Sequence, residues 1–141
     1  MPNLSVEIVS PDKTVFAGDA QGVRAPGVEG SFEVLYNHAP MIAAFGVGPI
    51  RVTTAAGDRI YFATSGGFLE VLDNKVTVLA ETAEPASDID VERARQAEER
   101  AIERLRVAEE ASERRAAEKA LERARNRLRV TMGQVGRRAN P

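Results

Sequence analysis

The chain divides into two parts of very different composition. No glycine, proline or aromatic residue occurs between Ala86 and Met132. The segment before it holds nine of the eleven glycines, six of the seven prolines and all seven aromatic residues. Glycine and proline mark turns, whereas a long stretch without them favours helix. The sequence therefore predicts a β domain over residues 1–85, followed by a helical domain over residues 86–141.

Short segments of strand-forming residues recur in the first part. In Leu4–Val9, the side chains of Val6 and Ile8 fall on one face, as expected for a half-buried strand. Asp73 and Asn74 predict a two-residue hairpin turn, because both residue types tolerate positive φ. Further strands are predicted at Ile50–Thr54, Arg59–Thr64, Phe68–Leu72 and Val76–Ala80. Many short strands between turns indicate a β-sandwich or barrel, and we expect Gly66-Gly67 to form a turn or bulge.

Apolar residues in the second part recur at steps of three and four, which predicts a narrow stripe on a helix. The stripe comprises Ala94, Ala97, Ala101, Leu105 and Ala108, then Ala117, Leu121, Ala124 and Leu128. Ser87 with Asp90 predicts a capping box at the start, and Ser112 predicts the cap of a second helix, with Glu113 at its N-terminal end. An antiparallel two-helix hairpin is the simplest fold, although one continuous helix of about 70 Å fits the same pattern.

We expect Gly133 and Gly136 to end the helical region and Arg137–Pro141 to be a disordered tail. The stripe between the helices is mostly alanine, and each buried methyl-sized group contributes only about 0.8 kcal/mol. Such a seam is weakly held once the entropy of ordering is subtracted. We therefore expect a hairpin that can extend away from the sandwich, although a stable hairpin serving as a spacer fits the same sequence.

The charge and composition exclude several classes of function. The chain has no cysteine, which excludes disulfide frameworks and cysteine-based metal or redox sites. It has no phosphate-binding loop and no catalytic constellation, and His38, its single histidine, stands without a nucleophile or metal ligands nearby in the sequence. We expect no enzyme activity and no metal site. The net charge of −2 conceals a basic end, because residues 114–141 carry +7. Such an end predicts an anionic partner.

The arginines of the helices suggest what that anion is. Arg93 and Arg100 lie seven residues apart and share one helix face, as do Arg123 and Arg127 at a spacing of four. In a hairpin, facing arginine pairs would form a socket for phosphate, because guanidinium groups bind oxyanions bidentately. Glu84 and Asp90 could accept hydrogen bonds from an adenine amine. Periodicity alone favours a solvated charged face over such a socket. No aromatic residue interrupts the basic stretch, so we expect no nucleic-acid partner.

Two segments of the first part, taken together, resemble the ε subunits of F-type ATP synthases. The first runs from Pro26-Gly27-Val28-Glu29-Gly30 to Asn37-His38-Ala39-Pro40, and the second is Thr64-Ser65-Gly66-Gly67-Phe68-Leu69-Glu70-Val71. The similarity continues over nearly the whole chain. It implies an N-terminal β-sandwich followed by two C-terminal helices, a fold class of β followed by α.

The resemblance also implies a function and a set of partners. The sandwich would bind the γ subunit and touch the c-subunit ring in the rotating central stalk, where it helps to couple proton flow to ATP synthesis. The helices would inhibit ATP hydrolysis by extending into the α/β catalytic hexamer. The expected location is the cytoplasmic face of the bacterial plasma membrane, with a plastid thylakoid as the alternative, and contact with the membrane is indirect. No cofactor is required, and ATP is expected as a regulatory ligand.

Some relatives bind ATP through an I/L-D-x-x-R-A motif, which this chain matches at residues 89–94. The resemblance therefore implies a nucleotide site formed by Glu84, Ile89, Asp90, Arg93, Ala94, Arg100, Arg123 and Arg127. It implies a subunit interface at Asn37, His38 and Pro40. A second hypothesis is an ATP-sensing module, built from the same sandwich and hairpin, that does not strongly inhibit a larger enzyme.

Overall fold

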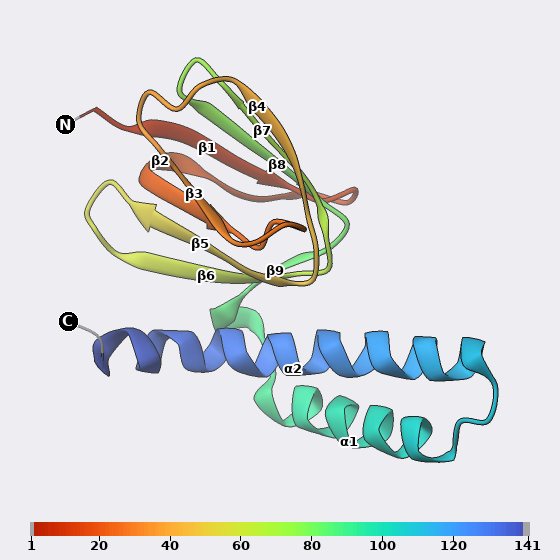
Figure 1. Cartoon of the computed structure of the whole chain (residues 1–141). Helices are drawn as coiled ribbons and strands as arrows, with labels where there is room; N and C mark the ends of the chain where they lie inside the picture. The colour runs from red at the N-terminus through yellow and green to blue at the C-terminus, as the bar shows by residue number, and fades with distance from the viewer. Residues whose placement is uncertain (1, 140–141) are drawn as a thin grey trace.

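The computed structural model describes residues 2–139, with side chains as far as Gly133, and shows a two-layer β-sandwich above a pair of antiparallel helices (Figure 1). The strands are β1 (Leu4–Val9), β2 (Thr14–Ala25), β3 (Phe32–Leu35), β4 (Met41–Phe45), β5 (Gly48–Thr54), β6 (Arg59–Thr64), β7 (Gly67–Leu72), β8 (Lys75–Ala80) and β9 (Ala83–Pro85). A short 3-10 turn, η1 (Ala86–Asp88), leads into the helices α1 (Val91–Val107) and α2 (Ala111–Ala139). The predicted fold class is confirmed.

The strands are hydrogen-bonded in the order β4-β7-β8-β1-β2-β5-β6-β9, and β3 pairs with β2 as a side branch. Strand β2 joins the two layers, because its first part pairs with β1 and its last part pairs with both β3 and β5. The register of β2 against β5 shifts between Ala20 and Gly22, which is the bulge expected where a long strand bends. Neighbours β1 and β8 run parallel, and the remaining pairs are antiparallel.

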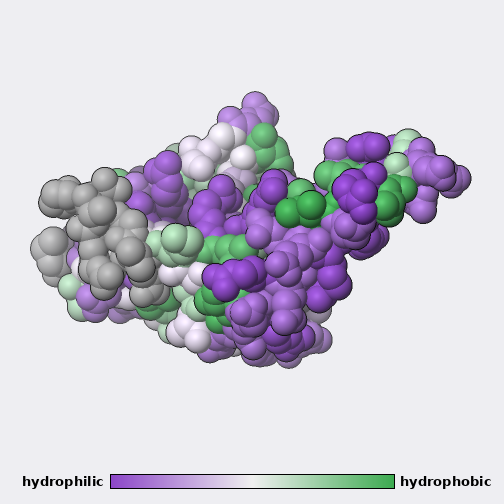
Figure 2. Space-filling model, turned by 90° about the horizontal axis from the view of Figure 1, so that it is seen from below, coloured by the Kyte–Doolittle hydropathy of each residue, from purple (hydrophilic) through white to green (hydrophobic). Residues whose placement is uncertain are grey.

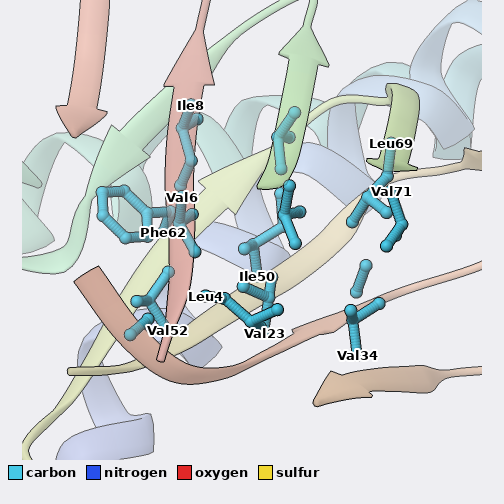
Figure 3. Packing of buried hydrophobic residues seen from close by; sticks show 14 of the residues in the cluster. Leu4, Val6, Ile8, Val23, Val34, Ile50, Val52, Phe62, Leu69 and Val71 are labelled. Atoms are coloured by element: carbon cyan, nitrogen blue, oxygen red, sulfur yellow. The ribbon is translucent and has the colours of Figure 1, made fainter. Parts of the chain in front are cut away.

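The interior of the sandwich is filled by the inward-facing residues of these strands. Phe62 packs edge-on against the partly buried Phe16 with the ring centroids 5.9 Å apart. Aliphatic side chains surround Phe62 in the core (Figure 3). The largest fully buried side chains are Phe62, Leu4, Ile8, Ile50, Leu69, Val6, Val23, Val34, Val52, Val71, Val76 and Val78. As predicted, Val6 and Ile8 point to the same side of β1.

The predicted hairpin turn is confirmed by backbone geometry. Asp73 and Asn74 have φ values of 50° and 62°, so both lie in the left-handed region that a two-residue hairpin needs. Gly66 and Gly67 also have positive φ, and a Cβ on Gly67 would collide with the carbonyl oxygen of Leu79. The backbone conformation and the close packing at this point therefore require glycine at both positions.

The helices form the predicted antiparallel hairpin, and α2 lies between α1 and the sandwich (Figure 1). The alanine stripe forms the seam as predicted, with Ala94, Ala101, Ala117 and Ala124 buried. Leu121 is 9% exposed. Small side chains let the helix backbones approach closely, but they bury little apolar area.

The predicted helix caps are wrong in detail. Ser87 lies inside η1, and Asp90 is the N-cap of α1, where its Oδ1 accepts a hydrogen bond from the backbone N–H of Arg93 at 3.1 Å. Ser112 lies inside α2, which begins at Ala111. The carboxylate of Glu113 instead reaches back and accepts from the N–H of Glu110 at 3.2 Å, so Glu113 has the predicted place in the first turn.

The predicted helix end at Gly133 and Gly136 is also wrong, because α2 continues to Ala139. A Cβ on Gly133 would lie 3.4 Å from the ring of Tyr61, so this glycine lets the helix pass close to the sandwich. A glycine often ends a helix, but here it allows close contact with the sandwich and the helix continues. The last part of the predicted tail, residues 140–141, lies outside the described residues.

The helices dock on the sandwich through a second, separate apolar cluster. Its buried members are Ala63, Ile89, Ala94 and Val130, with Tyr61, Ala86 and Leu128 packed around them. None of these residues belongs to the sandwich core. Asn126 of α2 adds a polar contact: it is 3% exposed, and its Nδ2 donates to the carbonyl oxygens of Gly48 at 2.9 Å and Thr64 at 3.4 Å. The hairpin can therefore be lost without opening the core.

Candidate functional site

A hollow of about 250 Å³ lies where the sandwich meets the base of the hairpin. Strand β9, turn η1 and the first turns of α1 supply one side, and α2 supplies the other. It is lined by Glu84, Asp88, Ile89, Asp90, Arg93, Ala94, Ala97, Arg100 and Arg127. Seven of the eight residues predicted for a nucleotide site are thus brought together, and Arg123 is the one left out.

Glu84 and Arg127 are joined directly. The Nε of Arg127 donates to Oε1 of Glu84 at 2.9 Å, which links α2 to β9, since Glu84 pairs with Ala63 in the β6–β9 ladder. Both side chains are about two-fifths exposed, so the pair is only partly shielded from water. The ion pair therefore connects α2 to the edge of the sandwich.

Arg123 lines a neighbouring hollow of about 210 Å³ between α1 and α2. Its other lining residues are Ala97, Arg100, Ala101, Arg104, Ala120 and Arg127, so four arginines face it and no carboxylate does. The two hollows share Ala97, Arg100 and Arg127. Together they form a groove with carboxylates at the sandwich end and arginines toward the hairpin tip, which suits a ligand with a hydrogen-bonding head and an anionic tail.

Sequence reasoning missed two charged residues of this groove. Arg104 follows Arg100 by four residues and therefore lies on the same helix face, a spacing that could have identified it. Asp88 lines the sandwich end of the groove. It lies in η1, whose formation the sequence pattern did not predict.

Several arginines of the helices are engaged in ion pairs. Arg95 pairs with Glu92 and Arg106 with Glu103 along α1, and Arg125 pairs with Glu98 across the hairpin. Among the side chains described, up to residue 133, the structure shows no ion pair for Arg93, Arg100, Arg104 or Arg123. Four guanidinium groups along the groove are thus available to an anion.

The segment 36–40, which connects β3 to β4 and contains the predicted interface residues, lies at the end of the sandwich away from the helices (Figure 1). Asn37 and Pro40 are exposed and His38 is half-buried. The backbone N–H of Asn37 donates to Oδ1 of Asn74 at 2.6 Å, and Nδ1 of His38 lies 2.7 Å from the carbonyl oxygen of Ala39. The loop is therefore ordered by contacts within the sandwich.

An apolar row crosses the outer face of the β4-β7-β8-β1 layer. Ala44 is the register partner of Phe68, Phe68 is the partner of Leu79, and Leu79 is the partner of Val9. Phe68 is 56% exposed and Leu79 is 54% exposed. Ile42, 72% exposed, projects on the same face one row away. Sequence reasoning assigned no role to this surface, although the strand period places Phe68 opposite the buried Leu69.

The helical side of the molecule has a different character. Seen from that side, the surface is mostly hydrophilic, with small hydrophobic patches (Figure 2). A shallow hollow of about 630 Å³ lies on another face of α2, with Val47, Leu105 and Leu121 among basic and acidic side chains. It contains none of the predicted site residues. Within the described residues, no helix combines the length and the apolar character that crossing a membrane requires.

Comparisons with known proteins agree on one family. Residues 3–86 match the model of the ATP synthase delta/epsilon chain β-sandwich domain, and residues 87–132 match that of its long α-helix domain. The ATP synthase epsilon chain of Salinibacter ruber is 64% identical over 143 residues, which covers 96% of each chain. That of Nitratidesulfovibrio vulgaris is 48% identical over 128 residues, covering 91% of this chain and 95% of the relative.

Two solved structures share the fold. A chain of the Euglena gracilis mitochondrial ATP synthase, from a structure of OSCP, F1 and the c-ring, aligns with a TM-score of 0.79 and 23% identity, covering 89% of this chain and 80% of that one. A chain of the Tetrahymena thermophila mitochondrial ATP synthase central stalk and c-ring aligns with a TM-score of 0.60 and 16% identity, covering 92% and 97%. At these identities the likeness concerns the fold alone.

Proposed function

The chain belongs to the delta/epsilon chain family of ATP synthases, as a non-catalytic central-stalk subunit, and from this premise we propose that its sandwich fixes it to the rotor while its hairpin regulates ATP hydrolysis. The observation that carries this proposal is the separation of the two apolar clusters. One part can stay bound to the rotor while the other changes its position.

We propose that the γ subunit binds the outer face of β4, β7 and β8. The row of Ala44, Phe68, Leu79 and Val9 offers contiguous apolar area, and Ile42 extends it. Exposed apolar area of this kind on an otherwise charged protein indicates a protein interface. Phe68 is its largest member and the expected anchor.

Replacing Phe68 with alanine is expected to weaken binding of the subunit to γ by about thirtyfold, in line with the loss of an aromatic interface anchor. Phe68 lies outside the core, so the fold should remain intact. Titration calorimetry with purified γ would measure the loss. The matched control is Ile102→Ala, which removes another exposed apolar side chain, 44% exposed, from α1. Equal affinity of Phe68→Ala and the wild type would contradict this assignment.

The loop at 36–40 is proposed to meet the c-subunit ring. It lies at the end of the sandwich opposite the hairpin, so a ring at that end would leave the helices free (Figure 1). The apolar face lies along the side, which allows γ and the ring to be contacted at the same time. Membrane association is then indirect, through the ring. The bacterial relatives support a peripheral position on the cytoplasmic face of the plasma membrane.

The hairpin is proposed to be the inhibitory part. Docked, it rests on β5 and β6 through Asn126 and the small second cluster. Released, it would present a basic α2, since residues 114–141 carry +7, to acidic surfaces of the α/β hexamer. Coupling of rotation to ATP synthesis is assigned to the sandwich, and inhibition of ATP hydrolysis is assigned to the helices.

The groove between β9, α1 and α2 is proposed to bind ATP as a regulatory ligand, which would hold the hairpin docked. Asp88 and Asp90 supply acceptors for an adenine amine, and Arg100, Arg123 and Arg127 supply donors for the phosphates. The nucleotide-contacting hollow of about 250 Å³ is slightly smaller than common ligand pockets of about 300–1,000 Å³, so the phosphates would occupy the adjoining arginine hollow. A ligand at one hundred times its Kd adds about 2.7 kcal/mol to the docked state.

The double variant Arg123→Ala with Arg127→Ala is expected to lower the affinity for MgATP by at least about a hundredfold, because two charge-assisted contacts are lost. Calorimetry on the full chain would measure it. The matched control, Arg95→Ala with Arg106→Ala, removes the same charge from exposed arginines that pair with Glu92 and Glu103. Unchanged binding by the first variant, or equal loss in both, would contradict a site in this groove.

The alternative is an ATP-sensing module without strong inhibitory action. The arginine hollow supports nucleotide binding, and nucleotide binding alone does not require inhibition. This alternative predicts nucleotide-dependent closure of the hairpin with no change in ATP hydrolysis by the complex. The two functions are therefore distinguished by whether the chain lowers the rate of ATP hydrolysis by the reconstituted synthase.

A further inference from the structure

Two asparagines from distant parts of the chain contact each other at the end of the sandwich away from the helices. Asn37 has a φ of 67° and Asn74 has a φ of 62°, so both lie in the left-handed region. The backbone N–H of Asn37 donates to Oδ1 of Asn74 at 2.6 Å, and Nδ2 of Asn74 donates to Oδ1 of Asn37 at 3.2 Å. One side-chain amide thus donates one hydrogen bond and accepts another across the gap between the two turns.

Asn74 is itself held firmly. It forms the β7–β8 turn with Asp73, and its carbonyl oxygen accepts a hydrogen bond from the N–H of Ser5 at 2.9 Å. The loop at 36–40 has fewer contacts of its own. The N–H of His38 bonds to the carbonyl oxygen of Leu35 at 3.2 Å, and Asn37, Ala39 and Pro40 are exposed. The loop therefore depends on Asn74 for its connection to the rigid part of the sheet.

We propose that Asn74 is a positioning residue for rotor docking: its side-chain amide fixes the loop at 36–40 in a preformed conformation that presents His38 and Pro40. This inference rests on the proposed function of that loop as the contact with the c-subunit ring. A loop that is already ordered loses less conformational entropy on binding, so a fixed loop binds more tightly than a loose one with the same side chains. Asn74 itself need not touch the partner.

The direction of the bonds makes the proposal specific. The shorter bond has a backbone donor on Asn37 and a side-chain acceptor on Asn74, so it depends on the side chain of Asn74 alone. Asn74→Gly keeps the turn but removes both bonds. Asn74→Asp keeps an acceptor oxygen for the Asn37 N–H and loses only the donor. Asn74→Gly should therefore be the severe variant, and Asn74→Asp should stay close to the wild type.

Two readouts test this. Hydrogen exchange at the Asn37 amide of the full-length chain should be at least about tenfold faster in Asn74→Gly, while the amides of β1 and β8 remain as protected as in the wild type. Binding to an ATP synthase complex stripped of this subunit should weaken about tenfold in Asn74→Gly, and Asn74→Asp should restore most of it. Loss of protection throughout the strands would instead indicate a general stabilising role and overturn the proposal.

The outcomes separate this inference from the proposed function. If Asn74→Gly leaves Asn37 exchange unchanged, or frees the loop without weakening assembly while Phe68→Ala does weaken it, the positioning role is wrong and the stalk function stands. If the wild-type chain fails to rebind the stripped complex at all, the proposed docking function itself fails.

Discussion

A chain that ends before Asp88 is expected to fold, to bind γ with the affinity of the full chain, and to lose all inhibition of ATP hydrolysis. The physical reason is that every member of the sandwich core precedes the helices, and none belongs to the docking cluster. Truncation removes Ile89, Ala94 and Val130 and uncovers only Ala63, Tyr61 and Ala86 of that cluster. The unfolding midpoint should therefore fall by no more than about 8 °C, which corresponds to about 1 kcal/mol for a small domain.

Three measurements on the truncated chain decide the division of labour between the two parts. Thermal unfolding reports the fold, calorimetry with γ reports docking, and the rate of ATP hydrolysis by the reconstituted synthase reports inhibition. The full chain in the same reconstitution is the reference. A truncated chain that inhibited as strongly as the full chain, or one that no longer bound γ, would show that the functions are not divided between sandwich and hairpin. Equal hydrolysis with and without the full chain would favour the ATP-sensing alternative.

Asn126→Asp is expected to have the opposite effect and to strengthen inhibition by releasing the hairpin. The Nδ2 of Asn126 donates to two carbonyl oxygens in a site where the residue is 3% exposed. A carboxylate there would place a buried negative charge against these two carbonyl oxygens. Nη2 of Arg129, which lies 3.3 Å from Oδ1 of Asn126, would offset only part of the cost of burying that charge. The docked state should lose about 2 kcal/mol or more, which is about a thirtyfold shift toward release.

Gln96→Glu is the matched control, because it makes the same amide-to-carboxylate change at an exposed position of α1. A distance label between the sandwich and α2 would measure release, and ATP hydrolysis by the reconstituted synthase would measure inhibition. A docked hairpin in Asn126→Asp would contradict the role of this contact. A released hairpin with unchanged hydrolysis would separate docking from inhibition.

The sandwich could be predicted in part because turn chemistry and strand alternation act locally. Asp73-Asn74 and the alternation in β1 correctly placed the β7–β8 turn and the inward face of Val6 and Ile8. Strands β2, β3, β4 and β9 were not predicted. Strand β2 contains Gly18 and Gly22, which weaken any strand pattern, and its bend comes from pairing with both layers. Strand β9 has three residues and exists through its pairing with β6.

The candidate groove could be predicted because helical periodicity fixes which side chains share a face. The spacing of Arg93, Ala97 and Arg100 places them together on α1, and the hairpin then brings Arg127 opposite. The ion pair between Glu84 and Arg127 and the buried position of Asn126 depend on how α2 lies against the sheet. No local pattern encodes that placement, so the sequence assigned no role to Asn126.

Hydrogen exchange on the isolated full-length chain, without nucleotide, tests most directly whether the helices are held weakly. The seam is mostly alanine and the docking cluster is small, so amides in the middle of α1 and α2 should exchange at least about a hundredfold faster than those of β1 and β8. Saturating MgATP should slow the helix amides and leave the strands unchanged. Helix amides protected as strongly as the strands, with and without nucleotide, would contradict a releasable hairpin.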